Sequence, residues 1–203
     1  LLNLNCDIFT SEAVDGGMVA NRHTAIVGRV ERPTPVLSSK IHQINFNPYW
    51  NVPKSIIRQD LIKYMQEDPE YLTTYRIHMY DGNGNEVLPS EVDWNTEEAV
   101  QYQFRQEPGA ENSMGHVKIN FPNPYDVYLH DTPQDELFDK DVRAFSHGCI
   151  RLEKPAEFAS WALGWPIERV REAMESETDN NQVSLKQKIP VYITYFTAFV
   201  KDG

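Results

Sequence analysis

The hexapeptide 146–151 (SHGCIR) places a thiol, an imidazole and a glycine next to one another. The thiolate is the reactive form of cysteine, and a nearby histidine is the usual group that activates it. His147 and Cys149 are two residues apart, so in extended backbone their side chains lie on the same face. Gly148 permits a close approach, and the amides of Gly148 and Cys149 could donate to a developing oxyanion. The hexapeptide therefore predicts a cysteine nucleophile that carries out acyl transfer.

A second histidine, His130, is the predicted general base. His147 is too close in sequence to Cys149 to face its thiol freely, whereas His130 ends the apolar run 125–129 and could approach from a neighbouring strand. Asp131 follows His130, but adjacent strand residues point to opposite faces. A backbone carbonyl could therefore orient the imidazole as well as Asp131 could, and the role of Asp131 stays open.

Other polar residues near the hexapeptide have two readings each. Arg151 could bind a substrate carboxylate through paired hydrogen bonds, or form a structural ion pair with a nearby acid. His130, His147 and Cys149 could hold zinc with an open position, but their spacing is unusual for zinc ligands. We therefore expect no metal and no cofactor.

The remaining histidines lie in separate segments and are predicted to be structural: His23, His42, His78 and His116.

Composition excludes several classes of partner. The chain has 19 basic and 30 acidic residues and a net charge of −11, which argues against binding to nucleic acid or to an anionic membrane. No apolar run approaches the ~20 residues that span a bilayer. The start at Leu1 has neither a methionine nor the features of a signal peptide, so we expect an excised domain or mature fragment. Cys149 must stay reduced to react, which leaves Cys6 as a small buried hydrophobic residue.

The pattern along the chain is mostly that of strands. Runs rich in β-branched and aromatic residues, bounded by turn residues, predict strands at 24–28, 40–46, 75–80, 100–105, 116–121, 125–130 and 191–200. Helices are predicted at 55–67, with Ser55 as N-cap, and at 155–164 and 166–175.

The length of 203 residues predicts a single domain over residues 1–203, interrupted at about 48–115. This stretch holds the best isolated helix and an acidic segment, and it breaks the series of strands. We interpret it as an insertion that forms a lid over the site; the alternative is an ordinary part of the main fold. Its aromatic residues Tyr49 and Trp50 could line a substrate groove, or pack in the core of the lid.

Taken together, His130, the fifteen residues after it and the hexapeptide resemble the signature of the L,D-transpeptidase (YkuD) catalytic domain. The segments 26–29 (IVGR), 32–35 (RPTP) and 118–121 (KINF) are similar to that family's opening strand and turn and to its approach to the site. Many members have glycine after the first histidine, whereas this chain has Asp131. That difference and the long insertion resemble the YcbB-type enzymes of Gram-negative bacteria, which carry a capping subdomain.

The resemblance implies a mainly β fold, a YkuD-like β-sandwich or mixed sheets with a few short helices, plus an inserted α-containing cap. It implies that Cys149 attacks the L-to-D bond of a peptidoglycan tetrapeptide stem, releases D-alanine and holds the stem as a thioester. An amine of a second stem then gives a 3→3 cross-link. His130 would be the base, and His147 and Gly148 would build the oxyanion pocket with Cys149.

The resemblance also implies surroundings for the reaction. Arg151 would support the site or the donor stem, and Ser146, Asp131, Tyr49 and Trp50 are further candidates for substrate contact. Such enzymes work in the periplasm, and penems or carbapenems acylate the cysteine.

Two other functions stay open at this point. A hydrolase on the same scaffold, either an L,D-carboxypeptidase or a cleaver of lipoprotein–peptidoglycan links, differs only in the acceptor. A non-catalytic wall-binding module would not require Cys149 together with both histidines. The acceptor, the third stem residue, further domains and the oligomeric state are not determined by the sequence.

Overall fold

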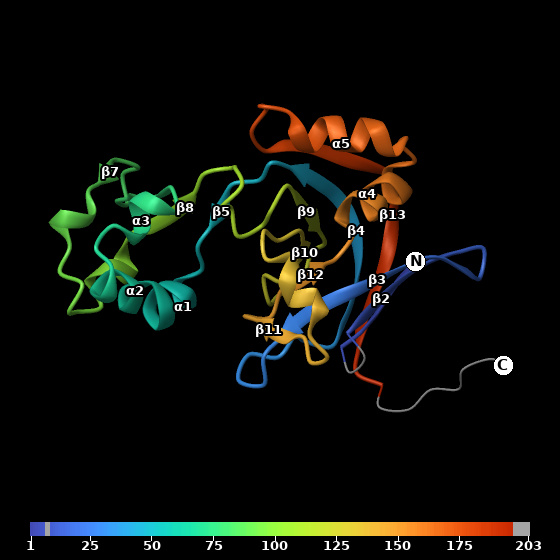
Figure 1. Cartoon of the computed structure of the whole chain (residues 1–203), viewed down its shortest axis with the longest axis horizontal. Helices are drawn as coiled ribbons and strands as arrows, with labels where there is room; N and C mark the ends of the chain where they lie inside the picture. Colours follow the sequence, from blue (N-terminus) through green and yellow to red (C-terminus); the bar gives the residue numbers. More distant parts are fainter. Residues whose placement is uncertain (7–8, 197–203) are drawn as a thin grey trace.

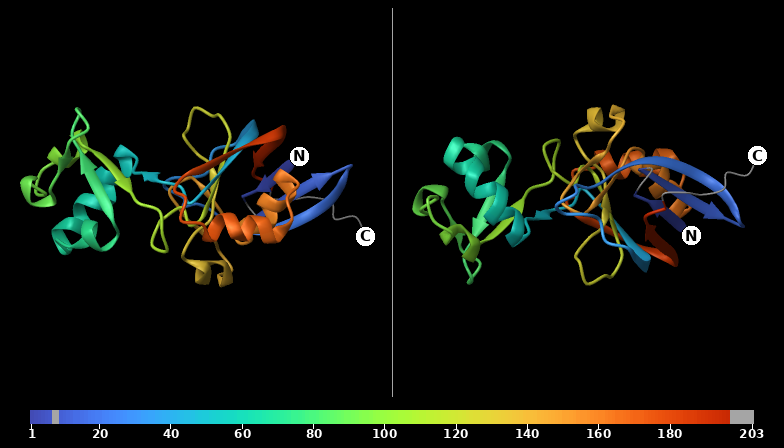
Figure 2. Two further views of the ribbon diagram at one scale, coloured as in Figure 1. Left: turned by 90° about the horizontal axis from the view of Figure 1, so that it is seen from above. Right: turned by 90° about the horizontal axis from the view of Figure 1, so that it is seen from below.

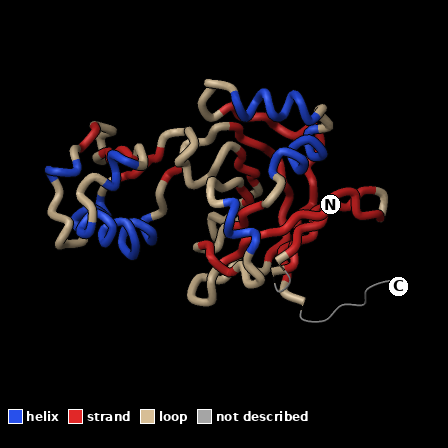
Figure 3. The backbone as a smooth tube through the Cα atoms, viewed as in Figure 1, coloured by secondary structure: helices blue, strands red, loops and turns tan. Residues whose placement is uncertain are grey.

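The computed structural model describes residues 1–6 and 9–196, and within them strands dominate (Figure 3). The strands are β1 (Leu2–Asn5), β2 (Thr10–Asp15), β3 (Met18–Gly28), β4 (Leu37–Phe46), β5 (Trp50–Asn51), β6 (Ile77–Tyr80), β7 (Glu86–Val87), β8 (Gln103–Gln106), β9 (Val117–Asn120), β10 (Leu129–His130), β11 (Ala144–Ser146), β12 (Ile150–Leu152) and β13 (Asn181–Thr194). The helices are α1 (Lys54–Ile56), α2 (Ile62–Glu67), α3 (Tyr71–Thr74), α4 (Pro155–Leu163) and α5 (Ile167–Glu175). A π-helical turn, Ile57–Leu61, joins α1 to α2, and 3-10 turns occur at Pro89–Glu91, Glu98–Gln101 and Asp135–Asp139. The fold is mainly β, as predicted.

Nine strands form one mixed sheet that closes on itself. Their order is β11-β3-β12-β10-β9-β4-β13-β1-β2, and β2 also pairs with β3. The closure is possible because β3 is long: its first part pairs with β2, and its last residues pair with β12 and β11. Most neighbours are antiparallel, but β10 and β12 run parallel. This parallel pair brings His130 and the hexapeptide to the same place.

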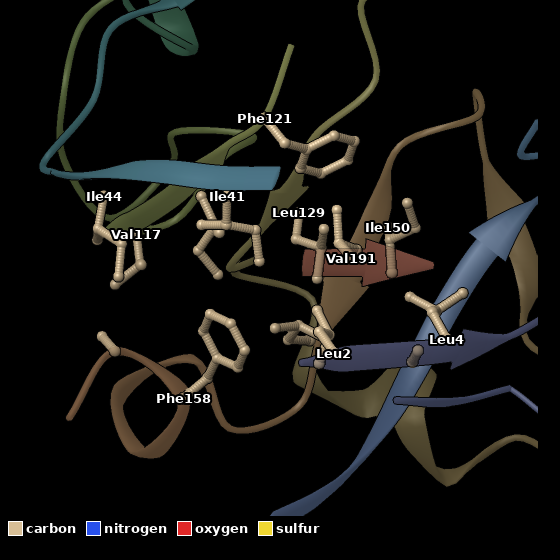
Figure 4. Packing of buried hydrophobic residues seen from close by; sticks show 14 of the residues in the cluster. Leu2, Leu4, Ile41, Ile44, Val117, Phe121, Leu129, Ile150, Phe158 and Val191 are labelled. Atoms are coloured by element: carbon tan, nitrogen blue, oxygen red, sulfur yellow. The ribbon is translucent and has the colours of Figure 1, made fainter. Parts of the chain in front are cut away.

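The closed sheet, the main lobe, encloses a hydrophobic core. Leu129 and Ile150 contribute from the site strands, and Ile41 and Val191 from β4 and β13. Helix α4 adds Phe158, which points into the same cluster (Figure 4). Every one of these side chains is fully buried, and burying an apolar side chain stabilises a fold by about 1.5–3 kcal/mol. The site strands are therefore anchored in the buried core of the main lobe.

Residues 50–106 form a second lobe with its own sheet, in the order β5-β8-β6-β7. Its hydrophobic cluster is separate from the main core and includes Ile57, Leu61, Leu72 and Phe104. The second lobe stands to one side of the main lobe (Figure 1), and views from above and below place it at one end of an elongated molecule (Figure 2). The second lobe falls within residues 48–115, the segment interpreted as an inserted lid. Its function as a lid stays a prediction.

Two predicted strands were placed differently. Of residues 125–130 only Leu129–His130 are strand, because Asn123 organises a turn: its Oδ1 accepts the N–H groups of Tyr125 and Val127. The strand predicted at 191–200 is β13, which begins ten residues earlier, at Asn181, and ends at Thr194. Much of the first half of β13 is polar because one face of the strand is exposed. This half therefore lacks the run of apolar residues by which a buried strand is predicted. Residues 197–200 of that prediction lie outside the described residues.

The predicted helices are confirmed apart from their boundaries. The segment predicted at 55–67 is helical from Lys54 to Glu67, but Pro53 rather than Ser55 occupies the N-cap position. Helix α4 ends as predicted at Gly164, which has φ 64° and accommodates the left-handed cap. Among the described residues, no helix is both long enough and apolar enough to cross a membrane.

Candidate active site

The site lies where β10 ends and β12 begins. The two strands pair in parallel register, with Leu129 opposite Ile150 and His130 opposite Arg151. A cavity of about 610 Å³ opens here, and Cys149 and His147 line it together with His130 and Arg151. Residues that the sequence separates by up to 21 positions therefore share one hollow.

Residues 146–149, the catalytic turn, are fixed by hydrogen bonds of their own. Gly148 adopts φ 114°, and its N–H donates to Ser146 Oγ at 3.1 Å. The Ser146 hydroxyl in turn donates to the carbonyl of Cys149 at 2.5 Å, so Ser146 closes the turn. The hydroxyl of Thr34 donates to the Gly148 carbonyl at 2.9 Å. Among the described residues, the N–H of Cys149 has no acceptor and stays available to a developing oxyanion.

His130 is held as a neutral base. Its Nδ1 lies 2.5 Å from the carbonyl oxygen of Asp131, which can only accept, so Nδ1 carries the proton and Nε2 keeps its lone pair. Burial, with a further contribution from the positive charge of Arg151, lowers the pKa of His130 to about 3. The backbone of Asp131 thus orients the imidazole. Its carboxylate is engaged elsewhere, accepting the N–H groups of His116 and Thr132 at 2.8 Å each.

The pKa of the Cys149 thiol is shifted in opposite directions by its surroundings. Burial raises its pKa, while hydrogen bonds from the backbone and side chain of Tyr128 and the positive charges of Lys118 and Arg151 lower it. Burial raises the pKa of Tyr128 well above its usual value, so its hydroxyl keeps its proton and can donate it. The Lys118 ammonium lies 4.2 Å from the centre of the Tyr128 ring.

His147 belongs to the catalytic turn, and Arg151 follows the turn on β12. Burial is the largest cause of the lowered pKa of His147, and its Nε2 is 3.8 Å from Oδ2 of Asp60. Arg151 donates to Oε1 of Gln134 at 2.7 Å and forms no ion pair with a carboxylate of the described residues. Its guanidinium is therefore able to take a substrate carboxylate.

The two aromatic candidates of the predicted lid differ. Trp50 lines the cavity, and its side chain acts to lower the pKa of Tyr128 against the larger effect of burial. The ring of Tyr49 does not line the cavity; its hydroxyl donates to Asp179 at 3.1 Å, and Arg105 stacks over it at 4.6 Å. Trp50 is thus at the site, and Tyr49 is beside it.

The remaining candidates lie away from the cavity. Both cysteines are free thiols, and Cys6 is buried in the main core. None of the histidines predicted to be structural lines the cavity: His23, His42, His78 and His116. Within the part of the chain that is described, no three His, Cys, Asp or Glu side chains are grouped as ligands of a metal ion.

A thiol, a neutral imidazole and a free backbone donor in one cavity are the groups that acyl transfer requires, and comparison with known proteins agrees. The sequence model of YkuD, the L,D-transpeptidase catalytic domain, matches residues 8–193. The chain belongs to this family. Its signature residues are therefore those of an L,D-transpeptidase domain.

The chain is also similar to a curated relative and, more distantly, to solved structures. A curated Haemophilus influenzae protein whose name places it among the L,D-transpeptidases is 35% identical over 193 residues, which cover 93% of this chain and 39% of that protein. Among solved structures, L,D-transpeptidase 3 from Mycobacterium tuberculosis gives a TM-score of 0.45 at 13% identity, over 95% of this chain and 60% of that one. Its complex with a faropenem-derived adduct gives 0.44 at 14% identity, over 95% and 58%. The chain thus spans between 39% and 60% of the length of these relatives.

Within this L,D-transpeptidase domain, sequence reasoning missed two residues beside the thiol, and strand geometry could have found both. Tyr128 is two residues before His130 and so points to the same side of the chain. Lys118 is the register partner of His130 on β9. A third residue, Thr34, lies in the RPTP segment noted for its resemblance, but nothing in the sequence indicates its contact with Gly148.

Proposed function

We propose that this domain forms 3→3 cross-links between peptidoglycan stems through a thioester on Cys149. The observation that carries the proposal is that a partly buried thiol shares one cavity with a neutral His130 whose Nδ1 is already committed to a carbonyl. Such a pair can move protons in both half-reactions, which is what a ping-pong acyl transfer requires.

In the first half-reaction, Nε2 of His130 takes the thiol proton as Sγ attacks the carbonyl carbon of the third stem residue. The charge that develops on the carbonyl oxygen is met by the free N–H of Cys149. Collapse of this intermediate breaks the C–N bond, and His130 gives its proton to the nitrogen of the departing D-alanine. The product is an acyl-enzyme thioester.

In the second half-reaction, the side-chain amine of a diamino acid on another stem attacks the thioester. His130 takes a proton from the amine, the C–S bond breaks, and the sulfur recovers a proton. The Gly148 N–H is bound to Ser146 Oγ, so its predicted place in the oxyanion pocket requires that this bond be exchanged for one to substrate. His147 would border the same pocket.

Two features favour a peptide stem as donor. Arg151, without a carboxylate partner among the described residues, would bind a carboxylate of the stem. The second lobe supplies Trp50 and other cavity-lining residues, so it would act as a cap that limits water, the competitor of the acceptor amine. As part of a cell-wall enzyme, the domain would work in the periplasm of a Gram-negative bacterium, with penems and carbapenems as acylating inhibitors.

The test is product analysis with a disaccharide-tetrapeptide by liquid chromatography and mass spectrometry, for the wild type and Cys149→Ala. We expect a cross-linked dimer that lacks one D-alanine, formed by the wild type alone. Free tripeptide without dimer would instead assign the domain to the L,D-carboxypeptidases. Binding without turnover, unaffected by Cys149→Ala, would indicate a wall-binding module and overturn the proposal.

A further inference from the structure

Asp60 lies at the contact between the two lobes. It belongs to the π-helical turn Ile57–Leu61 of the second lobe, and its side chain is only 16% exposed. Its Oδ2 accepts a hydrogen bond from Nη1 of Arg32 at 3.2 Å, and its Oδ1 is 3.8 Å from Nη2 of Arg29. Nε2 of His147 is 3.8 Å from the same Oδ2. One acid of the second lobe therefore faces three basic side chains of the main lobe.

The helix around Asp60 is anchored in the second lobe. Ile57 and Leu61, at either end of the π-helical turn, are buried in that lobe's own cluster, and α2 continues with Ile62 and Met65 in the same cluster. Turns of this type are rare and often occur at functional sites. The position of Asp60 is thus fixed by the packing of the second lobe.

Residues 29–34, the arginine loop, support the catalytic turn directly. The N–H of Arg29 donates to the carbonyl of Ser146 at 3.0 Å. Thr34 donates to the carbonyl of Gly148 and accepts the N–H of Gly28, both at 2.9 Å. The arginine loop thus holds the turn at two carbonyls, and Asp60 holds the two arginines of that loop.

The negative charge of Asp60 compensates the positive charges of the arginine loop. Asp60 is the carboxylate partner of both Arg29 and Arg32 among the described residues. Without it, the two guanidiniums would face His147 with no nearby compensation, and removing one partner of a buried ion pair is more disruptive than removing an exposed pair. Trp50 of the second lobe lines the same cavity as Asp60 and Cys149. The second lobe therefore contributes more than one side chain to the site.

We propose that Asp60 is a positioning residue for acyl transfer, which holds the arginine loop and His147 so that the catalytic turn keeps its geometry while the second lobe is in place. This inference rests on the proposed function, because it assumes that Cys149 is the acylated group. It assigns the second lobe a part in building the site, in addition to covering it.

The test compares two reactions of the same thiol. Acylation of Cys149 by a carbapenem, followed by stopped-flow absorbance, needs an ordered catalytic turn; alkylation by iodoacetamide does not. For Asp60→Asn we expect the maximal acylation rate to fall about tenfold, the equivalent of one ordinary hydrogen bond, with alkylation unchanged. Asp60→Glu should recover part of the loss.

Further variants separate positioning from misfolding. Glu67→Gln is the matched control, because Glu67 lies on α2 and pairs only at the exposed surface with Lys63, 3.9 Å away. Arg32→Gln breaks the same contact from the main lobe and should reproduce the Asp60→Asn loss, and the double variant should be no worse than either single one.

The outcomes distinguish this inference from the proposed function. Acylation of Asp60→Asn at the wild-type rate, with the wild type acylated at Cys149, would overturn the positioning role alone. Equal loss of acylation and alkylation would also overturn it, because that points to general disruption. A wild type that is never acylated would overturn the proposed function itself.

Discussion

His130 is buried and Cys149 is partly buried, and burial disfavours the charged form of each side chain. A buried thiol resists ionisation, which raises the pKa of Cys149, and a buried imidazole resists protonation, which lowers the pKa of His130. Both shifts favour the neutral pair over a thiolate–imidazolium pair. The proton would then leave the sulfur only when an acyl donor is bound. The Cys149 thiol of the free enzyme should therefore react slowly with alkylating and oxidising reagents.

The pH dependence of alkylation tests this state of the pair. Because the pKa of Cys149 is raised, its thiolate fraction should keep growing with pH beyond the ordinary thiol value of about 8.5. We expect the rate of alkylation by iodoacetamide to keep rising as the pH is raised past about 8.5. The rate is measured in a Cys6→Ala variant, so that Cys149 is the one remaining thiol. A rate plateau that begins below about pH 7 would indicate a preformed ion pair and contradict the prediction.

Tyr128 is the residue-scale contact that the sequence pattern overlooked. Tyr128→Phe removes the hydroxyl that lowers the pKa of Cys149. We expect carbapenem acylation to slow by about tenfold, the equivalent of one hydrogen bond, and the alkylation profile to move to higher pH. Tyr192→Phe, on an exposed part of β13, is the matched control. An unchanged profile would mean that the hydroxyl does not act on the thiol.

At the scale of elements, the site depends on the end of β3, the arginine loop and the catalytic turn rather than on long strands. Gly28 ends β3 and begins the arginine loop, and the backbone there leaves no room for a side chain. A Cβ on Gly28 would lie 2.2 Å from the carbonyl oxygen of Arg32 and 2.6 Å from the nitrogen of Thr34. Both are backbone atoms, so neither can move aside cheaply.

Gly28→Ala is therefore expected to displace the arginine loop and, through Thr34, the catalytic turn. We expect the free energy of unfolding to fall by about 2 kcal/mol or more, in the range of overpacked buried positions, and acylation to fall with it. Urea unfolding measures the first quantity. Gly82→Ala is the control, since its Cβ would meet no atom within 4 Å. Equal stability of the two variants would contradict the role of close packing at Gly28.

At the scale of the whole molecule, two hydrophobic clusters divide the chain. The residues of the second cluster all lie between Trp50 and Phe104, and the main core is built from segments on both sides of that range. Regions with separate cores can open with separate free energies. The second lobe should therefore be able to lose its structure while the main sheet stays folded.

Leu72→Ala tests this separation. Leu72 is fully buried in the second cluster, and removing its side chain should cost that lobe about 3 kcal/mol. We expect faster amide hydrogen exchange across residues 50–106, with β4 and β13 still protected. Ile44→Ala in the main core should instead raise exchange throughout the main sheet. Uniform loss of protection in Leu72→Ala would show that the two lobes unfold as one.

The sequence by itself determined the family and much of the local structure. The hexapeptide and the spacing to His130 were enough to identify the family, and alternation and capping residues predicted seven of the thirteen described strands and both C-terminal helices. These signals are local: a side chain's reactivity, a period of two, or a glycine after a helix act over a few residues.

Only the tertiary structure decided how the site is assembled. The closure of the sheet through β3, the polar half of β13 and the contacts of Tyr128, Thr34 and Asp60 with the catalytic turn depend on which segments meet across long stretches of chain. The backbone carbonyl of Asp131, which fixes the tautomer of His130, has the same chemistry in every residue and so leaves no trace in the sequence. Pairing and burial decide such roles, because they set which donors, acceptors and charges share one enclosed space.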